Sequence, residues 1–187
     1  MTQLTDTEGA MALRAARTFA EAKIFNMDAP VPNYPPVFDE KRGVFVTITE
    51  NNMLRGCIGF PYPVKPLFIS LREAAEAAAT EDPRFMPIEE YEIPGLHFEV
   101  TILTMPEVLK GPAAERASRI EVGRHGLIAS RDGQSGLLLP QVAEEYGWSA
   151  EEFLSQTCWK AGLAEDAWKS EDCIIQTFEG QIFSEED

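Results

Sequence analysis

The residues best suited to chemistry form one short run, Arg55-Gly56-Cys57-Ile58-Gly59. Two glycines weaken a strand, and they are expected where a ligand or another backbone approaches closely. On a regular strand Arg55 and Cys57 would share a face, and a neighbouring cation favours the thiolate, the reactive form of cysteine. The run therefore predicts a reactive thiol at Cys57, with ligand-binding groups at Arg55, Gly56 and Gly59. The alternative is that Cys57 is a small buried hydrophobic residue in a bulged strand.

A second polar segment, Asp82-Pro83-Arg84-Phe85, follows an apolar helical stripe. As the wall of a site, Asp82 could accept a proton and Arg84 could bind an anion. As scaffold, Arg84 would pair with a carboxylate while Phe85 fills the core. We expect the scaffold role for the segment as a whole, with Arg84 as its best candidate for ligand binding.

The third segment, Gly123-Arg124-His125-Gly126, places a histidine between glycines in an expected loop. Such a histidine is accessible and titrates near neutral pH. If the fold brought His125 to Cys57, the two would form a nucleophile and base pair. The alternative is a turn histidine without a catalytic partner.

Other recognisable sites are not evident in the sequence. It contains no Walker-type phosphate loop, dinucleotide fingerprint, Gly-x-Ser-x-Gly elbow or metalloprotease helix. No zinc-ligand spacing occurs among the three cysteines, Cys57, Cys158 and Cys173. We therefore expect neither a metal nor a cofactor.

Periodicity indicates the elements that must position these residues. A first helix capped by Asp6 or Thr7 should end near Phe25, and a second should begin at Pro66 and end before Asp82. Alternation predicts a strand over 44–49, a turn at Asn51-Asn52 and a return strand over 53–58. Further expected elements are a short helix at 88–91, strands at 98–102, 120–122, 127–129, 137–139 and 174–178, a hairpin turn at Asp132-Gly133, and a helix with a Ser149/Glu152 capping box ending at Gly162. This order predicts an α+β fold with a mainly antiparallel sheet flanked by helices.

Composition limits the function further. Asp and Glu outnumber Lys and Arg by 31 to 16, which gives a formal charge of -15. Such a surface repels phosphates, so nucleic-acid binding is not expected. No apolar run approaches the roughly 20 residues that cross a bilayer, and the N-terminus has no signal-peptide pattern, so we expect a cytoplasmic protein with reduced thiols.

Taken together, these segments resemble the AMMECR domain family. The matching segments also include Gly43-Val44-Phe45-Val46-Thr47, Leu137-Leu138-Leu139-Pro140-Gln141-Val142 and Cys158-Trp159-Lys160-Ala161-Gly162-Leu163. The hexapeptide Leu54-Arg55-Gly56-Cys57-Ile58-Gly59 is intact and is similar to the family signature. The resemblance implies a single domain over 1–187, with a larger part and a smaller subdomain, and it implies no established activity.

The resemblance also implies partners, because related domains occur fused to, or encoded beside, Memo-like and radical-SAM proteins. Two functions remain open. In the first, the signature binds a ligand or a protein partner. In the second, an enzyme uses Cys57 as nucleophile or redox thiol and His125 as base, on a small anionic substrate.

Overall fold

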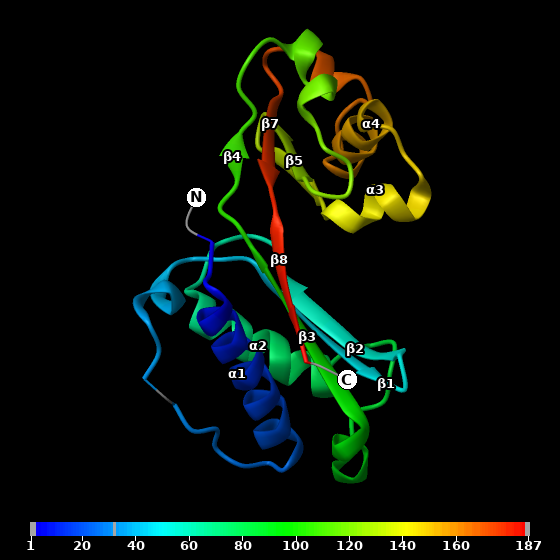
Figure 1. Ribbon diagram of the computed structural model, residues 1–187. Coiled ribbons are helices and arrows are strands. Elements are labelled where there is room, and N and C mark those ends of the chain that lie inside the picture. Colours follow the sequence, from blue (N-terminus) through cyan, green and yellow to red (C-terminus); the bar gives the residue numbers. More distant parts are fainter. Residues whose placement is uncertain (1–2, 32, 186–187) are drawn as a thin grey trace. The chain divides into compact units, whose positions relative to one another are not determined.

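A computed structural model describes residues 3–31 and 33–185 of the chain (Figure 1). Helices and antiparallel sheets make it an α+β protein, as predicted. The chain divides into two compact units. Unit 1 comprises Met1–Thr104 and Gln181–Asp187, and unit 2 comprises Met105–Gly180. Each unit has its own hydrophobic core.

A four-stranded sheet forms the frame of unit 1, in the order β2-β1-β3-β8. The hairpin turn between the first two strands lies at Asn51 and Asn52, whose φ angles of 51° and 62° are left-handed, as predicted for these residues. β1 pairs antiparallel with both β2 and β3. The strands are β1 (Val44–Glu50), β2 (Met53–Phe60), β3 (Leu96–Leu103) and β8 (Gly180–Ser184).

Two helices, α1 (Asp6–Ile24) and α2 (Leu67–Thr80), cover one face of this sheet (Figure 1). Strand alternation directs one set of aliphatic side chains toward the helices, and these side chains are fully buried. They are Val44, Val46, Ile48, Phe98, Val100 and Ile102. The opposite face of the sheet carries the alternate residues, and we call it the outer face. Short 3-10 helices, η1 (Pro36–Asp39) and η2 (Glu90–Gly95), complete unit 1.

Unit 2 contains a second four-stranded sheet, in the order β4-β7-β5-β6. Asp132 and Gly133 have φ angles of 52° and 81° and form the predicted hairpin turn between β5 and β6. Helix α4 begins at the predicted capping box of Ser149 and Glu152. The elements are β4 (Glu107–Val108), β5 (Gly126–Arg131), β6 (Gln134–Leu138), β7 (Ile174–Phe178), α3 (Pro140–Tyr146), α4 (Ala150–Lys160), η3 (Ala113–Glu115), η4 (Ala117–Arg119) and η5 (Ala167–Lys169).

Four local predictions were wrong. The short helix expected at 88–91 is instead the 3-10 helix η2 over Glu90–Gly95, because Glu89 is extended and caps it. Thr5, rather than Asp6 or Thr7, caps α1, because its side chain accepts from the Glu8 N–H while Glu8 bonds back to Thr5. Residues 120–122 are not a strand, since the segment turns there and the Arg124 and His125 N–H groups donate to the Glu121 carbonyl. β2 extends beyond the predicted end to Phe60, before the first of the prolines that follow it.

Among the described residues, no helix is both long enough and apolar enough to cross a membrane.

Candidate functional site

Four polar side chains form a line across the outer face of unit 1. Cys57 of β2 lies opposite Thr47 of β1, and Thr47 lies opposite Glu99 of β3. The Cys57 Sγ is 3.3 Å from the Thr47 Oγ1, and the Ser184 Oγ of β8 donates to the Glu99 Oε2 at 2.8 Å. We call these four residues the polar row. It joins a thiol, two hydroxyls and a carboxylate on one surface.

Cys57 is half-buried on the outer face. It occupies the outer face because its opposite residue, Thr47, alternates with the buried Val46 and Ile48. The other two thiols differ from it, because Cys158 and Cys173 are fully buried in the core of unit 2. Burial raises the pKa of Cys158 to about 12 and also raises that of Cys173.

Asp82 and Arg84 cover the edge of β2 at Cys57. The Cys57 N–H donates to the Asp82 Oδ2 at 2.9 Å, and the Arg84 Nη2 donates to the Cys57 carbonyl at 3.1 Å. Arg84 also donates to both oxygens of Asp82, at 2.9 Å and 2.7 Å. The two side chains thus make, at one residue, the hydrogen bonds that a neighbouring strand would make, which protects an otherwise open edge.

The electrostatics of this pair assign different roles to its members. Hydrogen bonds from Arg84 lower the pKa of Asp82 strongly, so its carboxylate stays ionised and is a weak base. The Asp82 side chain is only 2% exposed, whereas that of Arg84 is 54% exposed. The pKa of Arg84 is raised, first by Asp82 and also by the charge of a Cys57 thiolate. Asp82 is therefore scaffold, and Arg84 is the accessible cation beside the thiol.

Arg55 is not the cation beside Cys57, because it pairs with Glu92. The register of β1 and β2 shifts between Ile48 and Thr49, so Arg55 falls in a bulge and the strict alternation expected with Cys57 is interrupted. Its guanidinium forms a bidentate pair with Glu92, at 2.7 Å and 3.1 Å, and this pair lowers the pKa of Glu92. It also donates to the carbonyls of Met86 and Pro87. These contacts link β2 to the loop before η2.

Close packing inside unit 1 explains why Gly56 and Gly59 have no side chain. A Cβ on Gly56 would lie 2.1 Å from the Ala78 carbonyl oxygen of α2, so this glycine lets a helix backbone approach the strand. A Cβ on Gly59 would lie 2.3 Å from the ring of Phe45 and 2.5 Å from the Val44 carbonyl oxygen. The approaching groups are therefore another backbone and an aromatic ring of the same unit.

His125 belongs to unit 2, whereas Cys57 belongs to unit 1. Its Nδ1 accepts a hydrogen bond from the Glu121 N–H at 3.0 Å, within a tight turn. The neighbouring Arg124 pairs with Glu121 and Glu179. The turn accounts for the position of this histidine, and its pairing with Cys57 stays a prediction.

Sequence reasoning missed Thr47, Glu99 and Ser184 as members of the site. Alternation alone placed Thr47 and Glu99 away from the aliphatic faces of their strands, but the register of three strands was needed to align them with Cys57. Among residues 3–31 and 33–185, no three His, Cys, Asp or Glu side chains are grouped to hold a metal ion.

We expect one of the three thiols to react rapidly in the native protein. Cys57 is half-buried on the outer face, while the two others are buried and have raised pKa values. Titration with a chromogenic disulfide should therefore release one equivalent rapidly and the remainder only after denaturation. Cys57→Ser should lose the rapid phase, and a rapid phase that persists in this variant would contradict the assignment.

The geometry defines a class, an α+β protein of two units whose signature strand places a thiol on an open sheet face. The family model for AMMECR1 matches residues 12–183, and the chain belongs to this family. It is 49% identical to protein Mbar_A1807 of Methanosarcina barkeri over 98% of this chain and 93% of that protein. It is 47% identical to a protein of Thermococcus onnurineus over 100% and 94% of the two chains.

A solved structure supports the fold. The crystal structure of uncharacterized protein PH0010 from Pyrococcus horikoshii is similar with a TM-score of 0.79 and 45% identity. The match covers 98% of this chain and 94% of that one. The names of these three relatives state no activity.

Proposed function

We propose that this protein is a binding module whose partner contacts the outer face of unit 1 at the polar row. The observation that carries the proposal is the surface itself: Cys57, Thr47, Glu99 and Ser184 lie in line across four strands, with Arg84 beside one end. Mixed donors and acceptors on an open sheet face suit recognition of another polar surface. The partner class is a Memo-like or radical-SAM protein, as the family resemblance implies.

The mode of recognition is by side chains. The Cys57 N–H and carbonyl are already bonded to Asp82 and Arg84, and α2 lies against Gly56. A ligand that pairs with the backbone at these positions would have to displace those contacts. A small anionic ligand would instead contact the exposed guanidinium of Arg84. The three free cysteines further support a cytoplasmic location, which we also propose.

A crosslinking experiment tests the proposal. A photoactivatable maleimide attached to Cys57 should crosslink to a Memo-like or radical-SAM protein from the same genome and give one adduct of the summed mass. The matched control carries Cys57→Ser with Arg14→Cys, which moves the label to an exposed position on α1, against the other face of the sheet. Equal adduct yields from both labels, or no adduct with either candidate partner, would argue against the outer face as the interface.

A second function, catalysis by the thiol, is favoured by two observations: Cys57 is half-buried, and Arg84 donates to its carbonyl. The thiol could act as a nucleophile or redox group on a small anionic substrate, which the exposed guanidinium of Arg84 would bind. Cys57→Ser separates the two functions. A binding module retains partner capture and its biological activity in this variant, whereas an enzyme loses activity with capture and fold intact.

A further inference from the structure

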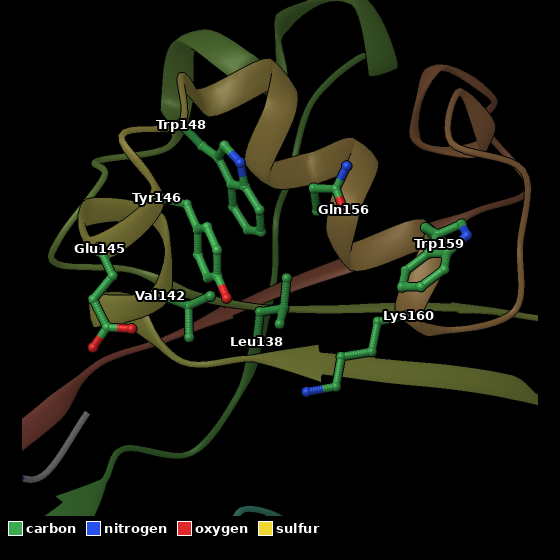
Figure 2. Close-up of a pocket in the computed structure, with 8 residues that line it drawn as sticks. All are labelled: Leu138, Val142, Glu145, Tyr146, Trp148, Gln156, Trp159 and Lys160. Atoms are coloured by element: carbon green, nitrogen blue, oxygen red, sulfur yellow. The ribbon is translucent and has the colours of Figure 1, made fainter.

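A groove in unit 2, distinct from the polar row, lies between α3 and α4 (Figure 2). Its volume is about 510 Å³, within the range of roughly 300–1,000 Å³ that is usual for ligand sites. Three aromatic side chains and three polar ones line it above an aliphatic floor. We call it the aromatic groove, and its residues are Leu138, Val142, Glu145, Tyr146, Trp148, Gln156, Trp159 and Lys160.

Local structure explains why these side chains converge. Gly147 ends α3 in the left-handed conformation, with φ of 65°, and the aromatic residues on either side of it stack. The rings of Tyr146 and Trp148 have centroids 4.8 Å apart and an interplanar angle of 13°. On α4, Gln156, Trp159 and Lys160 recur at the spacing that places residues on one helix face. Figure 2 shows the stacked pair at one end of the groove and Trp159 at the other.

The aromatic surface of the groove is open. Tyr146 is 69% exposed and Trp159 is 66% exposed. Aromatic side chains gain most by burial, so a cluster of exposed rings is typical of a binding surface. The cluster is concave and has aliphatic side chains, Leu138 and Val142, in its floor. It therefore suits an apolar ligand with ring-sized groups.

The polar groups of the groove are mainly donors. They are the indole N–H groups of Trp148 and Trp159, the Gln156 amide and the Lys160 ammonium. Within the described part of the chain, none of these four groups forms a hydrogen bond or an ion pair. A ligand that satisfies them must be rich in acceptors. The lining side chains offer fewer acceptors, namely the Glu145 carboxylate, the Gln156 carbonyl and the Tyr146 hydroxyl, so the part of the ligand inside the groove needs few donors of its own.

We propose that the aromatic groove binds a proline-rich peptide in the polyproline II conformation. Proline has no N–H, so such a peptide offers carbonyl acceptors without matching donors, and its backbone makes no internal hydrogen bonds. Its rings pack on tyrosine and tryptophan faces, as in other aromatic-lined grooves. Glu145 at the rim and the formal charge of -15 select a peptide flanked by arginine or lysine. A nucleotide would stack equally well, but its phosphate would have one cation in the groove, Lys160, on a chain with a formal charge of -15.

Binding can be measured on the full chain by tryptophan fluorescence. A synthetic polyproline peptide flanked by arginines should produce a saturable change, because two of the three tryptophans line the groove. Trp159→Ala should weaken binding by about tenfold or more, as expected for loss of a large aromatic contact. Tyr146→Ala is a second variant at the other end. Tyr91→Ala removes a residue of unit 1 that is 77% exposed and should leave affinity unchanged.

A charge-reversal variant tests whether the groove selects a proline-rich peptide with positively charged flanks. Glu145→Lys should weaken the arginine-flanked peptide and strengthen a glutamate-flanked one. A peptide with alanine in place of every proline should not bind. The proposal is overturned if the alanine peptide binds equally, or if Trp159→Ala retains its fold by circular dichroism and binds with unchanged affinity. It is also overturned if adenosine monophosphate binds and the proline peptide does not, or if sedimentation shows a dimer that Trp159→Ala dissociates.

Discussion

Gly56→Ala should lower the free energy of unfolding by about 3 kcal/mol or more, at the upper end of the cost of overpacking. The added Cβ would lie 2.1 Å from the Ala78 carbonyl oxygen, and neither atom belongs to a flexible side chain that could rotate away. α2 must therefore shift from the sheet, which opens contacts along its buried stripe of Leu71, Ala74, Ala75 and Ala78. Since 1 kcal/mol corresponds to about 2–4 °C in a chain of this length, the thermal midpoint should fall by roughly 6–12 °C.

Circular dichroism is the suitable measurement, because all three tryptophans, Trp148, Trp159 and Trp168, lie in unit 2 and fluorescence does not report on unit 1 directly. Gly95→Ala is the matched control. A Cβ there would meet only the Glu50 side chain, at 3.4 Å, so the change should stay within about 1 kcal/mol. A Gly56→Ala protein as stable as wild type would show that the strand does not depend on close approach of the helix.

Asp82→Asn should also be strongly destabilising, by about 2–3 kcal/mol near neutral pH. The carboxylate accepts hydrogen bonds from the Cys57 N–H and from the Arg84 backbone and guanidinium. Removing one partner of a buried pair costs about 3–5 kcal/mol, and we reduce this figure because Arg84 is half-exposed and solvated. The NH₂ group of the asparagine would also face the Cys57 and Arg84 N–H groups, which are donors, so hydrogen bonds at the edge of β2 would be lost.

The pH dependence of this effect has a defined sign. Because the pKa of Asp82 is lowered in the folded protein, its contribution is fully present above the pKa of an unfolded aspartate, about 3.9. It is lost as pH falls below that value toward the folded pKa. Urea unfolding at several pH values should therefore show wild type and Asp82→Asn converging in stability as the solution is acidified.

Asp132→Asn serves as the control for charge alone. Asp132 is exposed in the β5–β6 turn with φ of 52°, a conformation that asparagine also adopts readily. Its stability should match wild type at every pH. If the difference between wild type and Asp82→Asn were constant down to strongly acidic pH, the carboxylate at position 82 would not be the group that stabilises the edge of β2.

Local sequence determined the features that depend on a few neighbouring residues. The turn at Asn51-Asn52, the capping box of Ser149 and Glu152 and the helix end at Gly162 follow from side chains that bond to, or relax, their own backbone. The segment around Asp82 and Arg84 was likewise expected to be scaffold, since a proline next to a charge pair favours a fixed turn. These predictions needed no knowledge of distant contacts.

Tertiary structure alone decided the roles of the signature residues. Arg55 was the expected cation beside Cys57, and only a bulge in β2 and the position of Glu92 left Arg84 as the neighbour of this residue. The sequence predicted that Gly56 admits a ligand, whereas in the structure the backbone of α2 packs against it. Side chains that meet across strands or between a helix and a sheet depend on register and packing, which involve residues far apart in the chain, and no local pattern in the sequence carries that information.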